Sequence, residues 1–548
     1  MEARVAELLA GLDERQRTAA TLGPGPAQII APAGSGKTAT LVARVGVLIA
    51  AGVPPKRILV VTFNRDAAVE LAQRIATRLG VTPGRDGPEV RTLHALARQV
   101  LRDGLSPPEL VPDRLPRLRR ARREVLTSHG LDVGLPTAEE LDGIVSAAIL
   151  EGREPDEPVR SVVAAYRRGL AADGAVDFDG LLAESLHRLQ ADGALRARWQ
   201  SRFAHVLVDE FQDVDATQLE LAMLLAEPER NLMVVGDDDQ TIYAWRLADV
   251  RRILEFPRRF PDATRIVLET NYRCPPSVIT AADRLIAVNR ERVPKALRAP
   301  ATAAGAAPVI HTWPLQGPGA TSRLAGELPG WADGGRLAVL ARTRAELAPL
   351  ALALVRAGIP HASAIPAPVS SEVVTQLLDR VRGDPDRPAF AALREARAAM
   401  GWNRGDPSEA LGEEAHAALD AALGWAVGSS SVGELLAGVA AARERLAALQ
   451  DPDAPIELAT VHGAKGREWP VVVVFGLEID RFPNQRSLDD ALDSARALEE
   501  ERRLAYVAVT RCRDRLILAF DPDRPSPFVG ELLGRPGMAR GRPRRPPR

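Results

Sequence analysis

The sequence is poor in cysteine and aromatic residues, and it has no long apolar run. Its 548 residues include two cysteines, Cys274 and Cys512, too few for a disulfide scaffold or a four-cysteine zinc module. No stretch approaches the roughly eighteen apolar residues that a transmembrane helix needs. The start, MEARVAELLAGLDERQR, mixes acidic and basic residues, unlike a signal peptide. We therefore expect a cytoplasmic protein that has no membrane partner.

Neither sign of charge dominates the chain. The 71 basic and 72 acidic residues leave a net charge of −1, so the overall field does not favour nucleic acid, and a polyanion would have to bind in a local groove. Among the basic residues lysine is scarce, with only Lys37, Lys56, Lys295 and Lys465. Because an ammonium and a guanidinium are not interchangeable where geometry is tight, each lysine is a candidate for a specific role.

The first motif is QIIAPAGSGKT, residues 28–38. It predicts a short apolar strand, a glycine-rich turn and a helix that begins near Lys37. The backbone N–H groups of such a turn, together with the helix N-terminus, bind the β- and γ-phosphates of a nucleotide. Lys37 would neutralise these phosphates, and the Thr38 hydroxyl would bind Mg²⁺. Ala31 replaces the first glycine of the usual pattern. The residues of the predicted phosphate cradle are Ala33, Gly34, Ser35 and Gly36.

Three further apolar runs end in polar residues, as parallel strands do: RILVVTF (57–63), HVLVDEFQD (205–213) and LMVVGDDDQ (232–240). Open α/β sheets build their sites at the carboxyl ends of such strands. Asp209 suits Mg²⁺ binding, and Glu210 suits orienting or deprotonating an attacking water. Gln240 lies at the tip of the third run.

The stretch GDDDQTIYAWR, residues 236–246, combines two kinds of chemistry. Its three carboxylates and a glutamine indicate a polar site that holds a metal or a phosphate. Tyr243 and Trp245, in a chain that is only 4% aromatic, would share one face of an extended segment. That spacing indicates a flat partner on which rings can stack.

Six segments occur in the order found in superfamily 1 DNA helicases of the UvrD/Rep/PcrA type. They are GSGKT, VDEFQD, GDDDQTIYAWR, NYRCPPSV (271–278), TVHGAKGREWPVVVV (460–474) and EEERRLAYVAVTRCRDRL (499–516). The chain resembles this family from residue 12 to about residue 520. It departs from the family pattern at several positions. Arg65 and Asp66 replace Asn-Lys, Leu247 replaces a glycine, Arg467 and Trp469 replace a leucine and a smaller aromatic residue, and Cys274 and Cys512 stand where the family usually has serine or alanine.

The resemblance implies that ATP and Mg²⁺ are the cofactors. Arg273 and Arg511 would reach the γ-phosphate, where charge develops in the transition state. Four residues would contact the nucleoside: Gln16 and Arg44 at the adenine, Tyr272 stacked on the base, and Glu468 at the ribose.

The resemblance also implies single-stranded DNA and 3′-tailed duplex DNA as partners, with movement from 3′ to 5′ by a protein that we expect to be a monomer. Stacking on aromatic side chains is worth roughly 1–3 kcal/mol per base and tolerates any sequence. The implied DNA contacts are Phe63, Thr92, His94, Tyr243, Trp245 and Arg246.

The expected fold is α/β, with two RecA-like P-loop motor domains that contain parallel sheets, each carrying an inserted, mainly helical subdomain. The first motor domain is predicted at residues 1–95 and 190–265, with its insert at 96–189. The second is predicted at residues 266–365 and 455–530, with a short insert at 366–454 that is broken by RGDPDRP and NRGDPSE. Residues 531–548 are predicted to be a basic disordered tail that could contact phosphate.

Three classes of function compete for these motifs. A DNA motor predicts an ATPase that single strands stimulate strongly. A metabolic P-loop kinase would need a pocket for a small acceptor, and that interpretation gives Tyr243 and Trp245 no role. An ATP-gated clamp or translocase, which binds single strands and strips proteins without productive unwinding, retains every motif and so stays open. The pathway also stays open between nucleotide excision repair, mismatch repair and replication restart.

Overall fold

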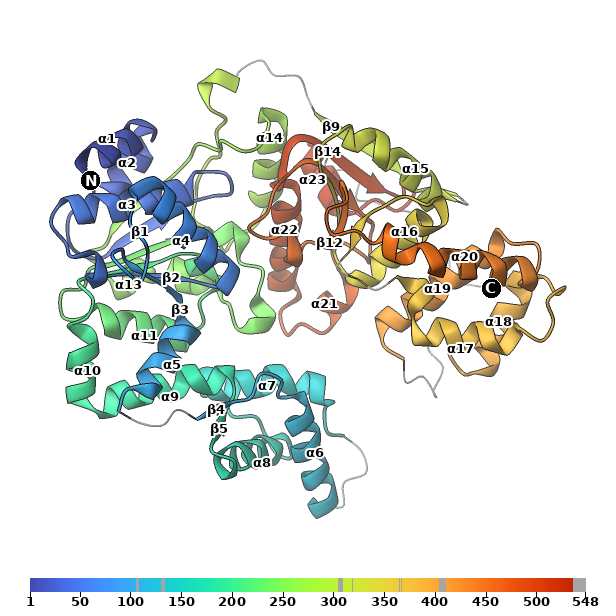
Figure 1. Ribbon diagram of the computed structural model, residues 1–548, viewed down its shortest axis with the longest axis horizontal. Coiled ribbons are helices and arrows are strands. Elements are labelled where there is room, and N and C mark those ends of the chain that lie inside the picture. Colours follow the sequence, from blue (N-terminus) through green and yellow to red (C-terminus); the bar gives the residue numbers. More distant parts are fainter. Residues whose placement is uncertain are drawn as a thin grey trace. The chain divides into compact units, whose positions relative to one another are not determined.

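The computed structural model describes residues 1–104, 108–129, 134–303, 309–317, 319–363, 365, 367–403 and 411–535 (Figure 1). The chain divides into two units. Unit 1 comprises Met1–Thr270 and Glu291–Lys295, and unit 2 comprises Asn271–Arg290 and the chain from Ala296 onward. Each unit contains one six-stranded parallel sheet, so the expected α/β fold with two parallel-sheet domains is confirmed. Within the described ranges, no helix is both long enough and apolar enough to cross a membrane.

The sheet of unit 1 has the order β3-β2-β6-β7-β1-β8, and all neighbouring strands are parallel. Its strands are β1 (Ala27–Ile30), β2 (Ile58–Thr62), β3 (Glu89–Thr92), β6 (His205–Val208), β7 (Leu232–Gly236) and β8 (Thr264–Val267). All four strands that the apolar runs predict are therefore present. Strands β1, β2 and β7 are buried along their whole length, because helices cover both faces of a parallel sheet.

Two cores lie on opposite faces of this sheet. Ile29 and Val60 belong to the core under α1, α3 and α4, whereas their neighbours Ile30 and Leu59 belong to the core under α5 and α11. This alternation is the two-residue period of a strand. The helices of this layer are α1 (Glu2–Ala10), α2 (Glu14–Ala20), α3 (Lys37–Ala50), α4 (Arg65–Leu79), α5 (Leu93–Arg102), α11 (Ala216–Ala226), α12 (Val250–Leu254) and α13 (Phe256–Arg259). Short 3-10 turns are η1 (Pro55–Arg57), η2 (Phe211–Asp213), η3 (Asp238–Gln240) and η4 (Ala244–Arg246).

The first insert is mainly helical. Leu118, Leu141, Val162 and Tyr166 form part of a separate core within it. Its elements are the two-stranded parallel sheet of β4 (Glu109–Leu110) and β5 (Ala175–Val176), and the helices α6 (Leu115–His129), α7 (Ala138–Leu150), α8 (Val159–Ala172) and α9 (Phe178–Ala191). Helix α10 (Gly193–Gln200) follows the insert, and its Leu195 and Trp199 belong to the core of the motor layer. In Figure 1, α6, α7 and α8 lie together with this small sheet.

The sheet of unit 2 has the order β11-β12-β10-β13-β14-β9, again with parallel neighbours. Its strands are β9 (Ile310–Pro314), β10 (Leu337–Ala341), β11 (Ala362–Ser363), β12 (Ile456–Thr460), β13 (Trp469–Phe475) and β14 (Cys512–Phe520). The helices are α14 (Pro276–Ile286), α15 (Ala320–Ala332), α16 (Arg344–Ala357), α21 (Gln485–Asp489), α22 (Ser494–Val509) and α23 (Pro527–Leu533), with the turns η5 (Ala301–Ala303) and η7 (His462–Ala464). Helices α14 and α22 pack against each other beside this sheet (Figure 1).

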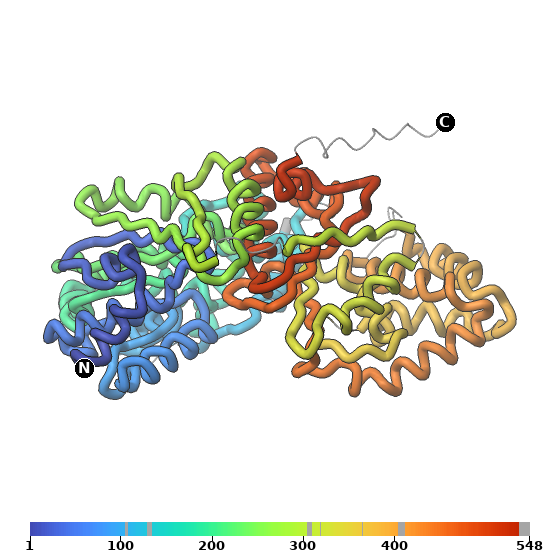
Figure 2. The backbone as a smooth tube through the Cα atoms, turned by 90° about the horizontal axis from the view of Figure 1, so that it is seen from above, coloured from blue at the N-terminus to red at the C-terminus, as the bar shows by residue number. Residues whose placement is uncertain are grey.

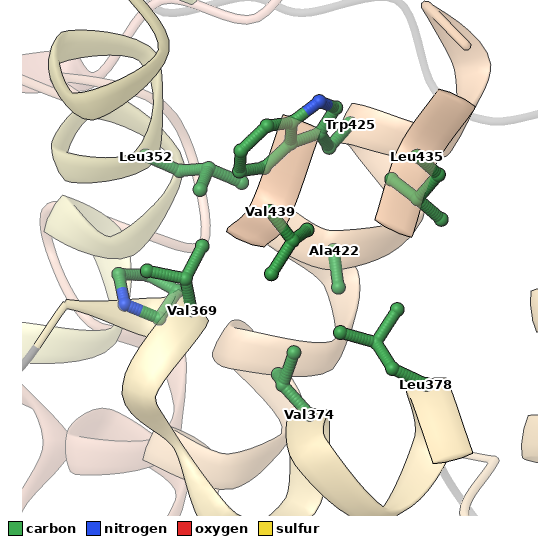
Figure 3. Close-up of a pocket in the computed structure, with 9 residues that line it drawn as sticks. Leu352, Val369, Val374, Leu378, Ala422, Trp425, Leu435 and Val439 are labelled. Carbon is green, nitrogen blue, oxygen red and sulfur yellow. The ribbon is translucent and has the colours of Figure 1, made fainter. Parts of the chain in front are cut away.

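The second insert is a group of helices, drawn in yellow to orange in Figure 2. Its elements are η6 (Pro368–Ser370), α17 (Glu372–Val381), α18 (Ala389–Ala399), α19 (Glu413–Val427) and α20 (Val432–Leu449). Figure 3 shows its apolar interior, where Val374, Leu378, Trp425 and Val439 face Leu352 of α16. Because Leu352 belongs to a helix of the motor layer, the insert is built onto that layer through a shared core.

Parts of the chain divide differently from the predicted boundaries. Residues 266–270 and Glu291–Lys295 group with unit 1, although the sequence boundaries place them in the second motor domain. The predicted tail begins at residue 531, but α23 continues to Leu533. Residues 536–548, which hold most of that tail, and residues 404–409 of the NRGDPSE break lie outside the described residues.

Candidate active site and nucleic-acid interface

The central strands of unit 1 bring three polar segments to one edge of the sheet. Strand β7 pairs with both β1 and β6, with Ile30 opposite Gly236 and Val208 opposite Val234. The next residue after β1 continues this pairing, since the Ala31 amide donates to the Gly236 carbonyl at 2.7 Å. The phosphate-cradle segment, the Asp209–Glu210 pair and the segment that ends at Gln240 therefore emerge side by side at the carboxyl edge.

The glycine-rich turn is closed by a contact from α2. Gly34 and Gly36 have φ values of 71° and 76°, in the left-handed region that favours glycine. A Cβ on Gly36 would clash with Nε2 of Gln16, which donates to the Ser35 carbonyl at 2.8 Å. The Ser35 hydroxyl is buried and has no hydrogen-bond partner among the described residues. An unpaired buried hydroxyl in this turn fits a site that is completed by an anionic ligand.

Lys37, the first residue of α3, lies between the two predicted catalytic carboxylates. Its Nζ is 3.2 Å from Oδ1 of Asp209 and also forms an ion pair with Glu210. Burial alone would lower the pKa of Lys37, but Asp209 and Glu210 outweigh it and raise that pKa. Burial raises the pKa of Asp209, and Glu210 adds to this while Lys37 opposes it. The arrangement keeps Lys37 charged where the motif predicts a phosphate ligand.

A hydrogen-bonded path joins Glu210 to Gln240. The Gln212 amide nitrogen donates to Glu210 at 2.6 Å, and the Gln212 amide oxygen accepts from the Asp237 backbone N–H at 3.0 Å. The Asp237 carboxylate accepts from Nε2 of Gln240 at 2.8 Å and from the Ala33 amide at 3.1 Å. Gln212 was not assigned a role from the sequence, although it belongs to the quoted VDEFQD segment. It links the ends of β6 and β7.

The three aspartates of the GDDDQ segment do not form a metal site. They are buried and bind Lys295 and Arg292, and no cluster of histidine, cysteine and acidic residues among the described residues could hold a metal ion. The interpretation of these carboxylates as metal ligands was therefore wrong, whereas the phosphate site to which Gln240 would belong stays a prediction. Their negative charge is neutralised by cations of the chain itself.

Arg44 supports the helix that carries Gln16. Its guanidinium donates to the carbonyls of Ala20, Leu22 and Gly23, at and after the end of α2. Burial lowers the pKa of Arg44 to about 10. In this conformation the contacts of Arg44 are structural, and the predicted assistance at the adenine stays a prediction.

Unit 2 gathers its predicted nucleotide residues around the starts of two neighbouring strands. Trp469 of β13 is in register with Cys512 of β14, which places Glu468 and Arg511 close together in the preceding loops. Nε of Arg273 is 2.6 Å from Glu468, and its Nη1 donates to the Thr510 carbonyl at 3.4 Å. Burial alone would raise the pKa of Glu468, but Arg273 and then Arg513 outweigh it and hold that pKa below its usual value.

The other two nucleotide candidates of unit 2 differ in exposure. Tyr272 is half exposed, and its predicted stacking on the base stays a prediction. Arg511 is buried, and its guanidinium donates to the carbonyls of Val507 at 3.0 Å and Arg467 at 3.4 Å. Arg511 is thus already oriented by backbone acceptors.

An aromatic surface begins at the end of the GDDDQTIYAWR stretch. The rings of Phe63 and Tyr243 stack with centroids 5.2 Å apart, and Trp245 meets Tyr243 edge-on at 6.3 Å. Trp245 is 61% exposed, and the Arg246 guanidinium lies 4.8 Å from its ring centroid. These rings and this cation form a surface of the kind that binds single strands.

The prediction that Tyr243 and Trp245 share a face of an extended segment was wrong. Residues Ala244–Arg246 form the 3-10 turn η4, and the Arg246 amide donates to the Tyr243 carbonyl at 2.8 Å. Leu247, at the family's glycine position, has a φ of 64° and closes this turn in the left-handed region. The two rings are brought together by the turn, and their interplanar angle is 70°.

Helix α5 adds a second part of this surface. Thr92 is the N-cap of α5, and its hydroxyl oxygen accepts a hydrogen bond from the Ala95 amide at 3.2 Å. His94 packs edge-on against Phe178, with centroids 5.7 Å apart, and Phe178 is somewhat less than half exposed. Burial lowers the pKa of His94, Asp179 opposes this shift and Arg246 adds to it, and the net lowering favours the neutral ring. Phe178 was not assigned a role from the sequence.

The chain matches models of a helicase family and is similar to named DNA helicases. Residues 12–113 and 137–261 match the UvrD/REP helicase N-terminal domain, and residues 428–521 match the UvrD-like helicase C-terminal domain. The chain is 30% identical to the ATP-dependent DNA helicase UvrD1 of Mycobacterium tuberculosis, over 94% of this chain and 82% of that protein. It is 28% identical to DNA helicase II of Escherichia coli, over 96% of this chain and 88% of that protein. It is also 28% identical to the ATP-dependent DNA helicase PcrA of Leuconostoc citreum, over 96% of this chain and 85% of that protein.

Proposed function

The chain belongs to the UvrD/REP helicase family, and on that premise we propose that it is an ATP-dependent DNA helicase that moves 3′ to 5′ along single-stranded DNA. One observation carries the proposal. A single segment, residues 236–246, contributes Gln240 to the hydrogen-bonded path that leads to Glu210, the partner of Lys37, and contributes Trp245 to the aromatic surface. A motor needs such a link between ATP hydrolysis and the binding of single-stranded DNA.

For ATP hydrolysis, the residues of unit 1 have distinct proposed roles. Lys37 would exchange its carboxylate partners for the β- and γ-phosphates, because the buried ammonium needs an anionic neighbour. Thr38 and Asp209 offer the hard oxygen ligands that suit Mg²⁺, which would offset phosphate charge when bound. Glu210 would orient the attacking water and accept its proton, held in place by Gln212. Gln240 would contact the γ-phosphate and the same water.

The residues of unit 2 would complete nucleotide recognition. Tyr272 would stack on the base and Glu468 would contact the ribose. Arg273 and Arg511 would supply positive charge where it is needed in the transition state. Gln16, whose amide closes the glycine-rich turn, would read the adenine, and the backbone of the turn would hold the phosphates.

DNA binding would use the aromatic surface and its polar neighbours. Trp245 offers an exposed ring for stacking, and Arg246 offers charge beside it. His94 would act as a neutral ring rather than as a cation, together with Phe178. Because stacking does not read sequence, we expect binding to any single strand, including the tail of a 3′-tailed duplex.

We further propose that residues 96–189 and 366–454 are inserted subdomains that modulate the motor, and that the protein acts as a cytoplasmic monomer in DNA repair or replication restart. A second candidate function is a translocase or clamp that strips proteins without productive unwinding. The alignment with UvrD1 extends over 649 positions although this chain has 548 residues, so the relative carries segments that this chain lacks. The second insert, which is expected from the sequence to be short for this family, favours the second candidate.

A strand-displacement assay separates these candidates. The substrates are duplexes with a 3′ tail, a 5′ tail or blunt ends, each with a fluorophore and a quencher on opposite strands. The proposal predicts ATP-dependent separation of the 3′-tailed duplex alone. Displacement of a bound protein from the 3′-tailed strand without strand separation would favour the clamp. Separation of only the 5′-tailed duplex would overturn the proposed polarity.

A further inference from the structure

Lys295 is one of only four lysines in the chain, and none of the roles above uses it. It lies in the short segment Glu291–Lys295, which groups with unit 1 although the residues on both sides of it group with unit 2. The Lys295 side chain is 0% exposed. A buried lysine at the end of a segment that returns to another unit requires a physical reason, because burying an ammonium is costly unless it is paired.

The reason is a cluster of three carboxylates. Nζ of Lys295 is 2.7 Å from Asp238, 2.7 Å from Asp239 and 3.7 Å from Asp237. Arg292 binds both oxygens of Asp239, at 3.0 and 2.8 Å. The Val293 amide donates to the second oxygen of Asp238 at 2.7 Å. The segment 291–295 thus holds the whole GDDD turn through side chains and backbone.

This cluster is directly connected to the candidate active site. Asp237, its first member, accepts from Nε2 of Gln240 at 2.8 Å and from the Ala33 amide of the phosphate cradle at 3.1 Å. The Asp237 carboxylate therefore fixes Gln240 and the cradle relative to each other. It can do so only while the neighbouring carboxylates are prevented from repelling it.

The charge of Lys295 is what prevents that repulsion. Burial alone would lower the pKa of Lys295, but Asp239, Asp238 and Asp237 outweigh it and raise that pKa, so the ammonium stays charged. The compact ammonium reaches all three carboxylates from one nitrogen atom. A guanidinium would have to spread its contacts over several nitrogen atoms, so a lysine suits this compact cluster.

We propose that Lys295, together with Arg292, is a positioning residue for ATP hydrolysis: it locks the Asp237–Asp239 turn so that Gln240 is held in the geometry that the reaction requires. The inference rests on the proposed ATPase function. It concerns residues that touch neither nucleotide nor DNA and that act through Asp237.

The test compares Lys295→Met with the wild type in steady-state ATP hydrolysis at saturating single-stranded DNA. Methionine preserves length and apolar bulk but removes the charge. We expect kcat to fall at least about tenfold while the KM for ATP changes little, because an interaction made in the transition state is lost. Lys56→Met is the matched control, since Lys56 is an exposed lysine of the same unit, and it should behave as the wild type.

A second variant separates positioning from folding. Lys295→Met with Asp238→Asn removes one buried negative charge together with the positive one, and the amide oxygen introduced by the second substitution can still accept from the Val293 amide. This double variant should recover a substantial part of kcat. Thermal unfolding is recorded for each protein. If Lys295→Met does not fold, kcat and the KM for ATP are measured for Arg292→Gln and for the double variant instead. A lower kcat with little change in KM for Arg292→Gln is then the expected result.

The outcomes are distinct. A wild type without DNA-stimulated hydrolysis contradicts the proposed function itself. A wild type that is active, with a folded Lys295→Met of unchanged kcat, overturns the positioning role. So does a folded double variant whose kcat stays as low as that of Lys295→Met, because charge balance would then not be the cause.

Discussion

Replacing Trp245 by alanine tests the aromatic surface most sharply. The side chain is 61% exposed, so its removal takes little out of the core, and we expect a stability change within about 0.5 kcal/mol. The Phe63–Tyr243 stack is formed by two other rings and is expected to remain in the variant. Loss of one stacked base is worth about 1–3 kcal/mol, which corresponds to a dissociation constant for single strands about 5 to 150 times weaker.

The assay is a fluorescence anisotropy titration of a labelled oligonucleotide without nucleotide, followed by ATPase and strand-displacement rates. Trp245→Ala should keep its ATPase rate in the absence of DNA and lose much of its strand displacement. Phe390→Ala is the matched control, since Phe390 is also an exposed ring with an arginine, Arg394, above it at 5.9 Å. If Trp245→Ala binds and unwinds as well as Phe390→Ala, the ring does not contact DNA and the proposed interface is refuted.

Three further predictions address the motor and its stability. Lys37→Arg should lose nearly all DNA-stimulated turnover, since a forked guanidinium does not replace the ammonium beside Asp209; wild-type rates would contradict the site. Gln240→Ala should bind ATP and DNA in titrations, yet its turnover should respond weakly to DNA; a full response would exclude a sensing role. Burial raises the pKa of Glu346 from 4.5 to about 7. The protonated carboxyl of Glu346 therefore contributes its full stability below about pH 4.5, and this contribution is lost as pH rises through about 7. Glu346→Gln should have a higher melting temperature than the wild type at pH 8 and the same melting temperature at pH 4.5. Equal melting temperatures at both pH values would contradict this.

The parts of the fold that could be predicted from sequence are those with local causes. Strands β1, β2, β6 and β7 are apolar runs because both faces of a parallel sheet are covered, and that composition is legible without a structure. The turn before Lys37 needs glycines at left-handed positions, and the sequence contains them.

The parts that could not be predicted depend on contacts between distant residues. Lys295 lies 57 positions from Asp238, and nothing in the local pattern of either segment shows that they meet. His94 and Phe178 come from different helices, so their edge-on contact has no local signature. The spacing of Tyr243 and Trp245 suggested an extended segment, because an i, i+2 pattern does not distinguish a strand from a 3-10 turn that places two rings together.

The most direct test of the central claim is steady-state ATP hydrolysis by the wild type and by Lys37→Ala, each with and without a single-stranded oligonucleotide. We predict that DNA raises wild-type turnover severalfold, and that Lys37→Ala is folded but inactive under both conditions. Turnover of the wild type that is indifferent to DNA, or a Lys37→Ala variant that hydrolyses ATP at the wild-type rate, would contradict it.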